Sequence, residues 1–511
     1  MPEKIRLHYS GAVNFAASVV SLLISFGFVV VITRRLSVEE FGLWALISTL
    51  MSYPLMPTSI WGYWYPRFVA RGVPKSTGTA FTVSLCYLPL ALAIYVLASY
   101  WLCNFVIGWG FWIAAIFGSL LTALNLMGGV VNGIASTCAP EVLGYSLLVY
   151  DALRLPLAYF FVVVLHLGLS GALLATILAG TLSTLAALMI LVRRGLRWDG
   201  VDFGLAKKWF KGFSIPLLGI FDGMLVNSDR TLLAGLCGSE GPVAYMSASY
   251  SLRDQIVYGR TTAAGLYARM LRDGPVSDVE EITKLYFAIS AFIFTSVLCL
   301  SYPLLSLLNP VYRDAYWVAW IASLYAFAEG FFGIFYSVVS GREKVDLRPE
   351  VSISDYVKSK LFKWSFASLT MHALSLIVGT AFLLAFLHGG LGVVFLASAY
   401  PVGWLIGFLA FLSFFYKLTK AVVDFELPWR DVVPFVVASL CSASCYLVLG
   451  SHTIEVANFW RDAPILLAHI AIAGATYFTV SYALSPWLRR LIKEARRFVF
   501  TEVLRAEPIL R

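Results

Sequence analysis

Residues 213–270 decide the fold, and they read FSIPLLGIFDGMLVNSDRTLLAGLCGSEGPVAYMSASYSLRDQIVYGRTTAAGLYARM. Two apolar segments are joined here by a short turn of Gly, Ser, Glu and Pro. Asp222 and Asp229 lie seven residues apart in the first segment, and Arg253 and Arg260 lie seven apart in the second. Seven residues are close to two helical turns, so each pair is predicted on one helix face. Charged side chains in an apolar helix indicate a partner or a water-filled space beside them.

Composition indicates a polytopic membrane protein. Hydrophobic residues make up 59% of the 511 residues and charged residues only 13%, whereas a soluble domain carries about 25% charged residues. Apolar runs of nearly the roughly 20 residues that a membrane-spanning helix needs recur from residue 11 to residue 485. We therefore predict an all-α protein with about fourteen transmembrane helices, among them segments 42–64, 213–236 and 243–268.

The net charge of +9 lies in the connections between these runs. Most Lys and Arg fall in alternate connections, as Arg193, Lys211 and Lys420 do, and such residues accumulate in cytoplasmic loops. This pattern predicts a multi-pass protein of the cytoplasmic membrane with both termini in the cytoplasm. No basic module interleaved with aromatic residues is present, so nucleic acid is not expected as a partner.

The connections are too short to hold a catalytic domain. The sequence contains no P-loop, no glycine-rich nucleotide fingerprint and no zinc-ligand spacing, so we expect neither an enzyme nor a metal or cofactor, apart from H⁺ or Na⁺ coupling. After the last apolar run, residues 486–505 place Leu, Ile and Phe among Arg and Lys. This pattern predicts an amphipathic helix on anionic lipid.

An internal repeat divides the chain into two halves. Residues 34–50 (RRLSVEEFGLWALISTL) and residues 234–252 (AGLCGSEGPVAYMSASYSL) both combine a turn containing Glu with the start of a helix rich in small and aromatic residues. Internal repeats are typical of transporters, whose substrate sites lie between the halves. We predict an N-terminal lobe at 1–205, a C-terminal lobe at 206–425, two appended spans at 426–485 and a cytoplasmic amphipathic tail at 486–511.

The first copy of the repeat also resembles a known family. RRLSVEEFGLWALIST at residues 34–49 looks like the signature R-x-L-G-x-E-E-[YF]-G-L-[YW] of polysaccharide flippases of the Wzx type, although Ser37 stands where that signature has Gly. These flippases belong to the multidrug/oligosaccharidyl-lipid/polysaccharide (MOP) exporter superfamily. Residues 67–70 and the hairpin at 227–249 are similar to further segments of the family. The resemblance implies two six-helix lobes around a central cavity that opens alternately to each side.

The charged pairs of the opening stretch allow two interpretations. Arg253 and Arg260 would attract an anionic lipid phosphate in a hydrated cavity, while Asp222 or Asp229 takes part in ion coupling. The alternative is a structural clasp between Asp and Arg side chains of two adjacent helices. Neutralising the arginines singly and measuring transport by stably inserted variants separates the two.

The first span contributes further candidates for the cavity. Asn14, Ser18, Ser21 and Ser25 share one helix face, which either borders the cavity or permits close helix packing. In the resembling family a basic residue at the outer end of this span borders the cavity, so Arg34 or Arg35 could meet the substrate phosphate; anchoring at the interface is the alternative.

The remaining candidates lie in other spans. Trp64 belongs to an aromatic cluster that would either bind a sugar ring or form an interfacial belt. Asp151 and Arg154 are three residues apart and are expected to neutralise each other. Glu329 is a lone carboxylate in its predicted span. It would be either a proton or Na⁺ site or a hydrogen-bonded neutral acid. His372 is predicted to be a packed polar core residue.

These observations favour a flippase for a lipid-linked oligosaccharide or related polysaccharide precursor. Its partners would be membrane lipid, the lipid-linked glycan and, as an open question, glycan-assembly enzymes. The nearest alternative is an ion-coupled exporter of small molecules or drugs from the same superfamily; a cationic drug would favour an acidic cavity. A membrane-embedded glycan polymerase or glycosyltransferase is a weaker alternative, because the outer loops are short.

Overall fold

The computed structural model describes residues 7–196, 198–257, 266, 270, 275–343 and 353–498. In this part of the chain the secondary structure is helical throughout, which confirms the predicted all-α membrane fold. Eleven described helices are long and apolar enough to cross a membrane, and the number rises to 12 if one bent pair counts as a span.

The helices of the N-terminal part are α1 (Leu7–Arg35), α2 (Val38–Leu50), α3 (Ser52–Leu55), η1 (Met56–Thr58), α4 (Ser59–Gly62), α5 (Tyr65–Ala70), α6 (Ser76–Trp101), η2 (Leu102–Ile107), α7 (Phe111–Cys138), α8 (Glu141–Ala158), η3 (Tyr159–Val164), α9 (Gly168–Arg193) and α10 (Phe203–Lys211). The C-terminal part contains α11 (Ser214–Val226), α12 (Ser228–Cys237), α13 (Gly241–Val257), α15 (Ser277–Leu308), η5 (Pro310–Ala315), α16 (Tyr316–Arg342), α17 (Ile353–Lys358), α18 (Lys360–His388) and α19 (Val393–Lys420). The chain ends with α20 (Trp429–Val448), η7 (Ser451–Thr453), α21 (Phe459–Leu484) and α22 (Pro486–Phe498).

Three of the predicted spans are not single long helices. The predicted span 42–64 is divided among α2, α3, η1 and α4, because Pro54 and Pro57 cannot donate the backbone hydrogen bonds that would continue one helix. The predicted span 213–236 breaks at Asn227, between α11 and α12. The predicted span 243–268 is described as α13 up to Val257, and its remainder, including Arg260, lies outside the described residues.

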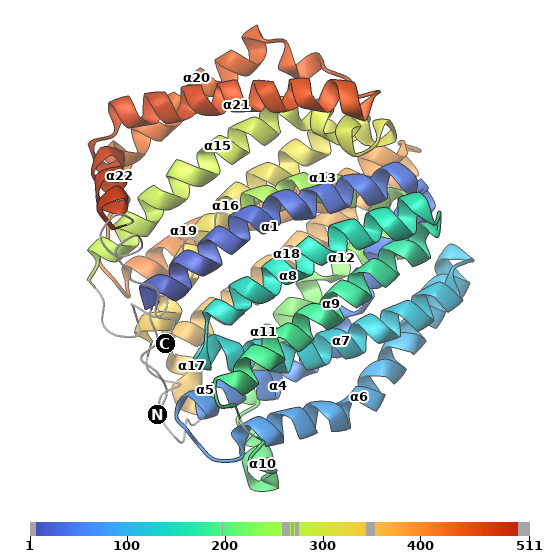
Figure 1. Ribbon diagram of the computed structural model, residues 1–511, viewed down its shortest axis with the longest axis vertical. Helices are drawn as coiled ribbons and strands as arrows, with labels where there is room; N and C mark the ends of the chain where they lie inside the picture. The colour runs from blue at the N-terminus through green and yellow to red at the C-terminus, as the bar shows by residue number, and fades with distance from the viewer. Residues whose placement is uncertain are drawn as a thin grey trace.

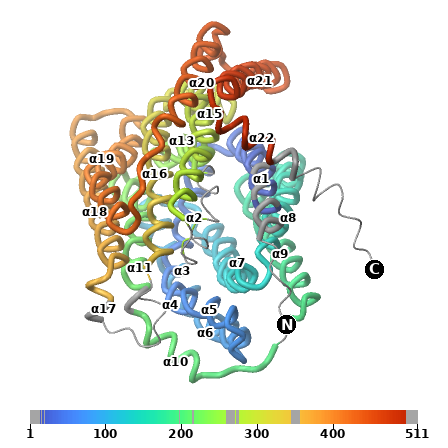
Figure 2. The backbone as a smooth tube through the Cα atoms, turned by 90° about the vertical axis from the view of Figure 1, so that its left-hand side faces the viewer, coloured from blue at the N-terminus to red at the C-terminus, as the bar shows by residue number. Residues whose placement is uncertain are grey.

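The long helices form two packed groups. In the N-terminal group (α1–α9), α1 packs on α8, α8 on α9, and α7 on α6 and α9. In the C-terminal group (α11–α19), α18 packs on α19, and α16 on α13, α15 and α19. Figure 1 shows α1, α8, α9, α7 and α6 side by side, and Figure 2 shows α18 and α19 on the opposite side of the molecule from α8 and α9. Helices α20 and α21 pack on each other and on α15.

The signature motif forms a local structure that explains its residues. Ser37 Oγ accepts a hydrogen bond from the backbone N–H of Glu40, and Glu40 Oε2 accepts one from the backbone N–H of Ser37. This capping box satisfies N–H groups at the start of α2 that have no partner within the helix. The second carboxylate oxygen of Glu40 accepts from the N–H of Leu169, so the same side chain also holds the start of α9.

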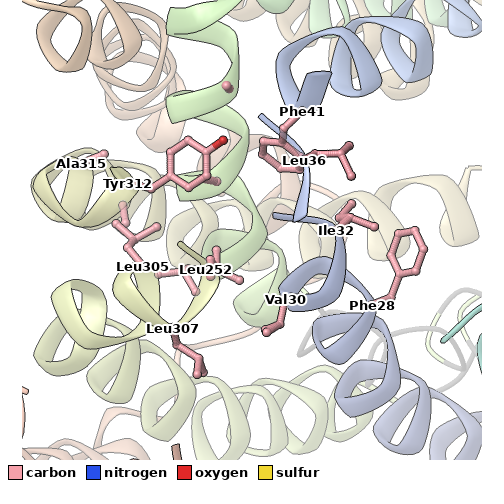
Figure 3. Packing of buried hydrophobic residues seen from close by; sticks show 14 of the residues in the cluster. Phe28, Val30, Ile32, Leu36, Phe41, Leu252, Leu305, Leu307, Tyr312 and Ala315 are labelled. Carbon is pink, nitrogen blue, oxygen red and sulfur yellow. The ribbon is translucent and has the colours of Figure 1, made fainter. Parts of the chain in front are cut away.

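The two ends of the bundle differ in charge and in packing. We call the end that carries Arg194, Lys211, Lys360 and Lys420 the basic end, and the end that carries the α1–α2 and α15–α16 connections the opposite end. At the opposite end, a large buried cluster joins the two helix groups. Figure 3 shows Phe28, Val30, Ile32, Leu36 and Phe41 of the N-terminal group close to Leu305, Leu307 and Tyr312 of the C-terminal group.

Candidate functional site

The two interrupted spans meet where their helices break. Tyr53, on α3, donates hydrogen bonds to the backbone oxygen of Asn227 at 3.1 Å and to Thr231 Oγ1 at 3.0 Å. Asn227 is the residue between α11 and α12, so this contact joins the breaks of the two helix groups. Discontinuous helices in both halves of a membrane protein are typical of substrate and ion sites near the middle of the bilayer.

Asp222, on α11, pairs with a histidine of the same helix group. His372 Nδ1 lies 2.5 Å from Asp222 Oδ1, and Ser368 Oγ donates to Asp222 Oδ2 at 2.9 Å. Ser368 and His372 lie four residues apart on one face of α18. The carboxylate and the imidazole together form a group that can hold or release a proton inside the bundle.

Asp229, on α12, accepts hydrogen bonds from aromatic side chains. Its Oδ2 atom receives one from Trp404 Nε1 at 3.2 Å and one from the Tyr250 hydroxyl at 3.3 Å. The Trp404 ring centroid also lies 5.4 Å from that of His372. Trp404 therefore contacts both Asp229 and His372, and His372 in turn contacts Asp222 on another helix.

Arg253, on α13, pairs with Glu329 on α16. Arg253 Nη2 lies 2.9 Å from Glu329 Oε2. The guanidinium carbon also lies 4.8 Å from the ring centroid of Tyr250 and 5.2 Å from that of Tyr325. Both charged side chains are mostly buried, at 18% and 20% exposure, so little of the ion pair is in contact with water.

These contacts differ from the alternative of a clasp between Asp and Arg side chains of two adjacent helices. Asp222 and Asp229 do not pair with Arg253 in the structure, because the break at Asn227 turns them toward different neighbours. Arg253 pairs instead with Glu329, a side chain that the sequence places alone in its span. The role of Arg260 remains a prediction, since this residue lies outside the described ranges.

The N-terminal group has its own buried ion pair. Arg154 Nη2 lies 2.9 Å from Asp151 Oδ1, as the three-residue spacing predicts. Ser25, on α1, accepts from Arg154 at 2.8 Å and donates to Asp151 at 2.9 Å. The Arg154 guanidinium lies 4.2 Å from the Phe28 ring centroid. This cluster therefore joins α8 to α1 in the interior of the group.

The polar face of α1 is mainly a packing surface. Asn14 donates to the backbone oxygen of Pro140 at 3.1 Å, and a Cβ at Gly144 would lie 3.2 Å from the Asn14 backbone. Ser18 donates to the Asn14 backbone oxygen at 2.8 Å, and Ser21 is fully buried. Together with the Ser25 contacts to α8, these positions correct the interpretation of the face as a cavity wall and favour close helix packing.

Arg34 holds three segments together at the opposite end. Its guanidinium donates to the backbone oxygens of Leu307 at 2.8 Å, Ser306 at 3.3 Å and Val456 at 3.1 Å. The carbonyls at the end of α15 have no partner within the helix and attract a cation. In this conformation Arg34 therefore joins α1 to α15 and to the α20–α21 connection, rather than bordering a cavity as the resemblance implies. Arg35, next to it, is exposed.

Three further hydrogen bonds join the two helix groups at the opposite end. Thr33 Oγ1 donates to the Leu308 backbone oxygen at 3.0 Å, and Asn309 Nδ2 donates to the Thr33 backbone oxygen at 2.8 Å. Glu240, at the start of the second repeat copy, accepts from Trp109 Nε1 at 2.9 Å and so links the two groups at the same end.

We expect Arg34→Leu to loosen the opposite end. Hydrogen bonds to charged groups contribute about 1.5 to 3 kcal/mol each, so losing those of Arg34 should raise the population of open molecules by at least about tenfold. A cysteine introduced at Leu308, in a chain whose native cysteines are replaced, reports this as faster labelling by a membrane-impermeant maleimide. Arg35→Leu is the matched control, and equal labelling rates in the two variants would refute the closure role of Arg34.

A cavity separates the two helix groups toward the basic end. Its volume is about 590 Å³, and it is lined by η1 and α3–α7 on one side and by α11, α16, α17 and α18 on the other. Trp61, Tyr63 and Tyr65 line it, but Trp64 does not. Trp64 Nε1 donates to the Gly212 backbone oxygen at 3.3 Å instead, which corrects its predicted place in the cavity.

Several residues of the site carry little signal in the sequence. His372 is in the core as predicted, but its contact with Asp222 makes it part of a charged group. Its four-residue spacing from Ser368 is a signal that could have been used. Trp404, Tyr250 and Tyr325 have none, because aromatic residues are common in all the apolar runs.

Comparisons with known proteins give a fold but no close relative. No family model and no curated protein matches the sequence. Among solved structures, an inward-facing conformation of a multidrug resistance MATE family transporter of the MOP superfamily has a TM-score of 0.57 at 14% identity, covering 81% of this chain and 99% of that chain. An outward-facing conformation of such a transporter has a TM-score of 0.54 at 16% identity, covering 81% and 95%.

A third solved structure shows the same likeness. A MATE transporter from Vibrio cholerae has a TM-score of 0.52 at 15% identity, covering 81% of this chain and 98% of that chain. The chain therefore has the fold of the MATE family transporters of the MOP superfamily.

Proposed function

We propose that this chain is a flippase that moves a lipid-linked oligosaccharide or related polysaccharide precursor across the cytoplasmic membrane by alternating access. The observation that carries the proposal is the difference between the two ends of the bundle. The helix groups are joined by a buried apolar cluster at the opposite end, and a cavity of about 590 Å³ separates them toward the basic end. Rocking of the lobes at 1–205 and 206–425 would close one end and open the other.

A flippase has to solve a definite physical problem. Each hydroxyl group that enters hydrocarbon without a hydrogen-bond partner costs roughly 2 to 7 kcal/mol, so a glycan cannot cross the bilayer unaided. A polar passage between the two groups would replace the lost hydration while the lipid tail remains in the bilayer. The accumulation of Lys and Arg at the basic end supports a cytoplasmic position for this end and for both termini.

The charged groups of the C-terminal group supply a route for ion coupling. Trp404 contacts both His372, the partner of Asp222, and the buried Asp229. The side chains of Asp222, His372 and Asp229 are of types that can bind a proton or a cation. We propose H⁺ as the coupling ion, because an imidazole in contact with the carboxylate suits a proton better than Na⁺, which prefers oxygen ligands.

The alternative is an ion-coupled exporter of small molecules. Two of the similar structures are of multidrug resistance transporters, which supports this alternative on grounds of fold. A cationic drug would favour a cavity with carboxylates. Among the described residues that line the cavity, none is Asp or Glu, and this favours the flippase.

Reconstitution into proteoliposomes tests the proposal. Fluorescent lipid-linked oligosaccharides are placed in both leaflets, and the accessibility of their headgroups to an external, membrane-impermeant reagent is followed with and without a pH gradient. A flippase should make the headgroups of the inner leaflet accessible, whereas liposomes without protein should not. Accumulation of a cationic dye, together with no movement of any lipid-linked glycan, would establish the exporter instead.

A further inference from the structure

The cavity toward the basic end has an unusual lining. None of the described residues that line it is Asp, Glu, Lys, Arg or His. Aromatic rings are supplied by Trp61, Tyr63, Tyr65, Tyr336 and Tyr356. We propose that this cavity binds uncharged sugar rings, as the subsite that receives the glycan part of the substrate; this inference rests on the proposed function.

The aromatic rings on the N-terminal side are held in place by hydrogen bonds. Trp61 Nε1 donates to Ser84 Oγ at 2.9 Å, and the Tyr65 hydroxyl donates to the Gly129 backbone oxygen at 3.0 Å. Both side chains are almost fully buried, at 2% and 4% exposure. The polar atoms of these residues are thus already used, and the two buried rings give rigid support to an aromatic wall whose more exposed rings are Tyr63 and Tyr336. Such a wall suits the apolar C–H face of a sugar ring.

Polar groups lie between the rings. Asn125 donates from its side-chain nitrogen to the Leu121 backbone oxygen at 2.8 Å, which leaves its side-chain oxygen as an acceptor. Ser59 on α4 and Ser365 on α18 add hydroxyls from the two helix groups. An apolar ligand would leave the Asn125 oxygen without a partner, and an ion would find no counter-charge among the described lining residues. A neutral molecule with both hydroxyls and flat C–H faces satisfies the lining.

Glycines enlarge the cavity at three positions. A Cβ at Gly62, Gly129 or Gly219 would meet no protein atom within 4 Å, although all three residues line the cavity. Gly133 is different, because its Cβ would lie 1.9 Å from the Tyr65 hydroxyl, so that glycine serves packing. Glycine weakens a helix relative to alanine. At Gly129 and Gly219 no close protein contact requires glycine, and we attribute its presence to the space that it leaves for a ligand.

The test fills this space and measures sugar binding directly. Purified protein in nanodiscs is examined by saturation-transfer difference NMR with a panel of neutral tri- to hexasaccharides of glucose, galactose, mannose and N-acetylglucosamine. An oligosaccharide of uronic acids and the cation ethidium serve as charged probes. The variants are Gly219→Phe and Gly129→Leu, which fill the cavity, and Gly219→Ala, which should leave most of it open.

Gly392→Leu is the matched control, because a Cβ there also meets no atom within 4 Å but Gly392 does not line the cavity. We expect saturable binding of at least one neutral oligosaccharide, weakened at least about tenfold in the filled variants and unchanged in Gly392→Leu and Gly219→Ala. Thermal unfolding of each variant checks that it is folded.

Three results would overturn the inference. The first is that the protein binds no neutral oligosaccharide. The second is that Gly219→Phe and Gly129→Leu bind the neutral oligosaccharide as well as the parent protein does. The third is that the protein binds only a charged probe and that Gly219→Phe abolishes this binding. Headgroup movement in proteoliposomes separates the two proposals. Movement that persists in Gly219→Phe rejects the subsite and keeps the flippase, whereas sugar binding without any headgroup movement keeps the subsite and rejects the flippase.

Discussion

Arg253→Met is expected to lower the free energy of unfolding by about 3 to 5 kcal/mol, because it breaks the buried ion pair between Arg253 and the Glu329 carboxylate. The two side chains are in contact at 2.9 Å and are mostly buried, so water compensates only in part for the lost contact. The loss of the contacts with Tyr250 and Tyr325 adds to the effect. Thermal unfolding in detergent, followed by the loss of monodisperse protein, measures it.

The double variant Arg253→Met with Glu329→Leu separates stability from transport. Replacing both partners of a buried ion pair with apolar side chains is often neutral, so the double variant should unfold close to the parent temperature. If Arg253 also attracts the substrate phosphate, this folded protein should still fail to move lipid-linked glycan. Parental transport by the double variant would assign the pair a purely structural role.

Asp222→Asn is expected to abolish transport driven by a pH gradient, while exchange without a gradient continues. The amide keeps the shape of the side chain and can still bond to Ser368, but it cannot form a charged pair with His372. In a coupled carrier, a site that no longer binds the ion cannot pass the energy of the gradient to the substrate. Proteoliposomes with an imposed pH difference measure both rates.

Ser368→Ala serves as the comparison for Asp222→Asn. It removes one hydrogen bond from the same carboxylate and leaves the contact with His372 unchanged, so gradient-driven transport should persist. Gradient-driven transport by Asp222→Asn at the parent rate would exclude this pair from coupling.

The membrane fold could be predicted from the sequence because its signal is local. Apolar runs give the positions of the helices, and in the part of the chain that the structure describes, eleven helices are long and apolar enough to cross a membrane. The interruptions were harder to predict. Pro54 and Pro57 indicate a break in the second span, whereas Asn227 is a residue that many continuous helices contain.

The partners of the charged residues could not be predicted, because they are set by how helices pack. Arg253 and Glu329 are 76 residues apart, Asp222 and His372 are 150 apart, and Arg34 and Val456 are 422 apart. Helical periodicity gives the face on which each side chain lies but not the helix that this face meets. Among the candidate site residues, Asp151 and Arg154, three residues apart on one helix, could be paired from their spacing.

The buried apolar cluster at the opposite end also affects whether ions can leak across the membrane. A continuous file of water through a membrane protein would let ions leak, and each unit charge gains about 2.3 kcal/mol per 100 mV of membrane potential as it crosses. The apolar side chains that join α1 to α15 are close-packed and almost fully buried, so they interrupt any such file beyond the cavity. If the chain is the carrier that we propose, this conformation would keep the membrane insulated while no substrate is being moved.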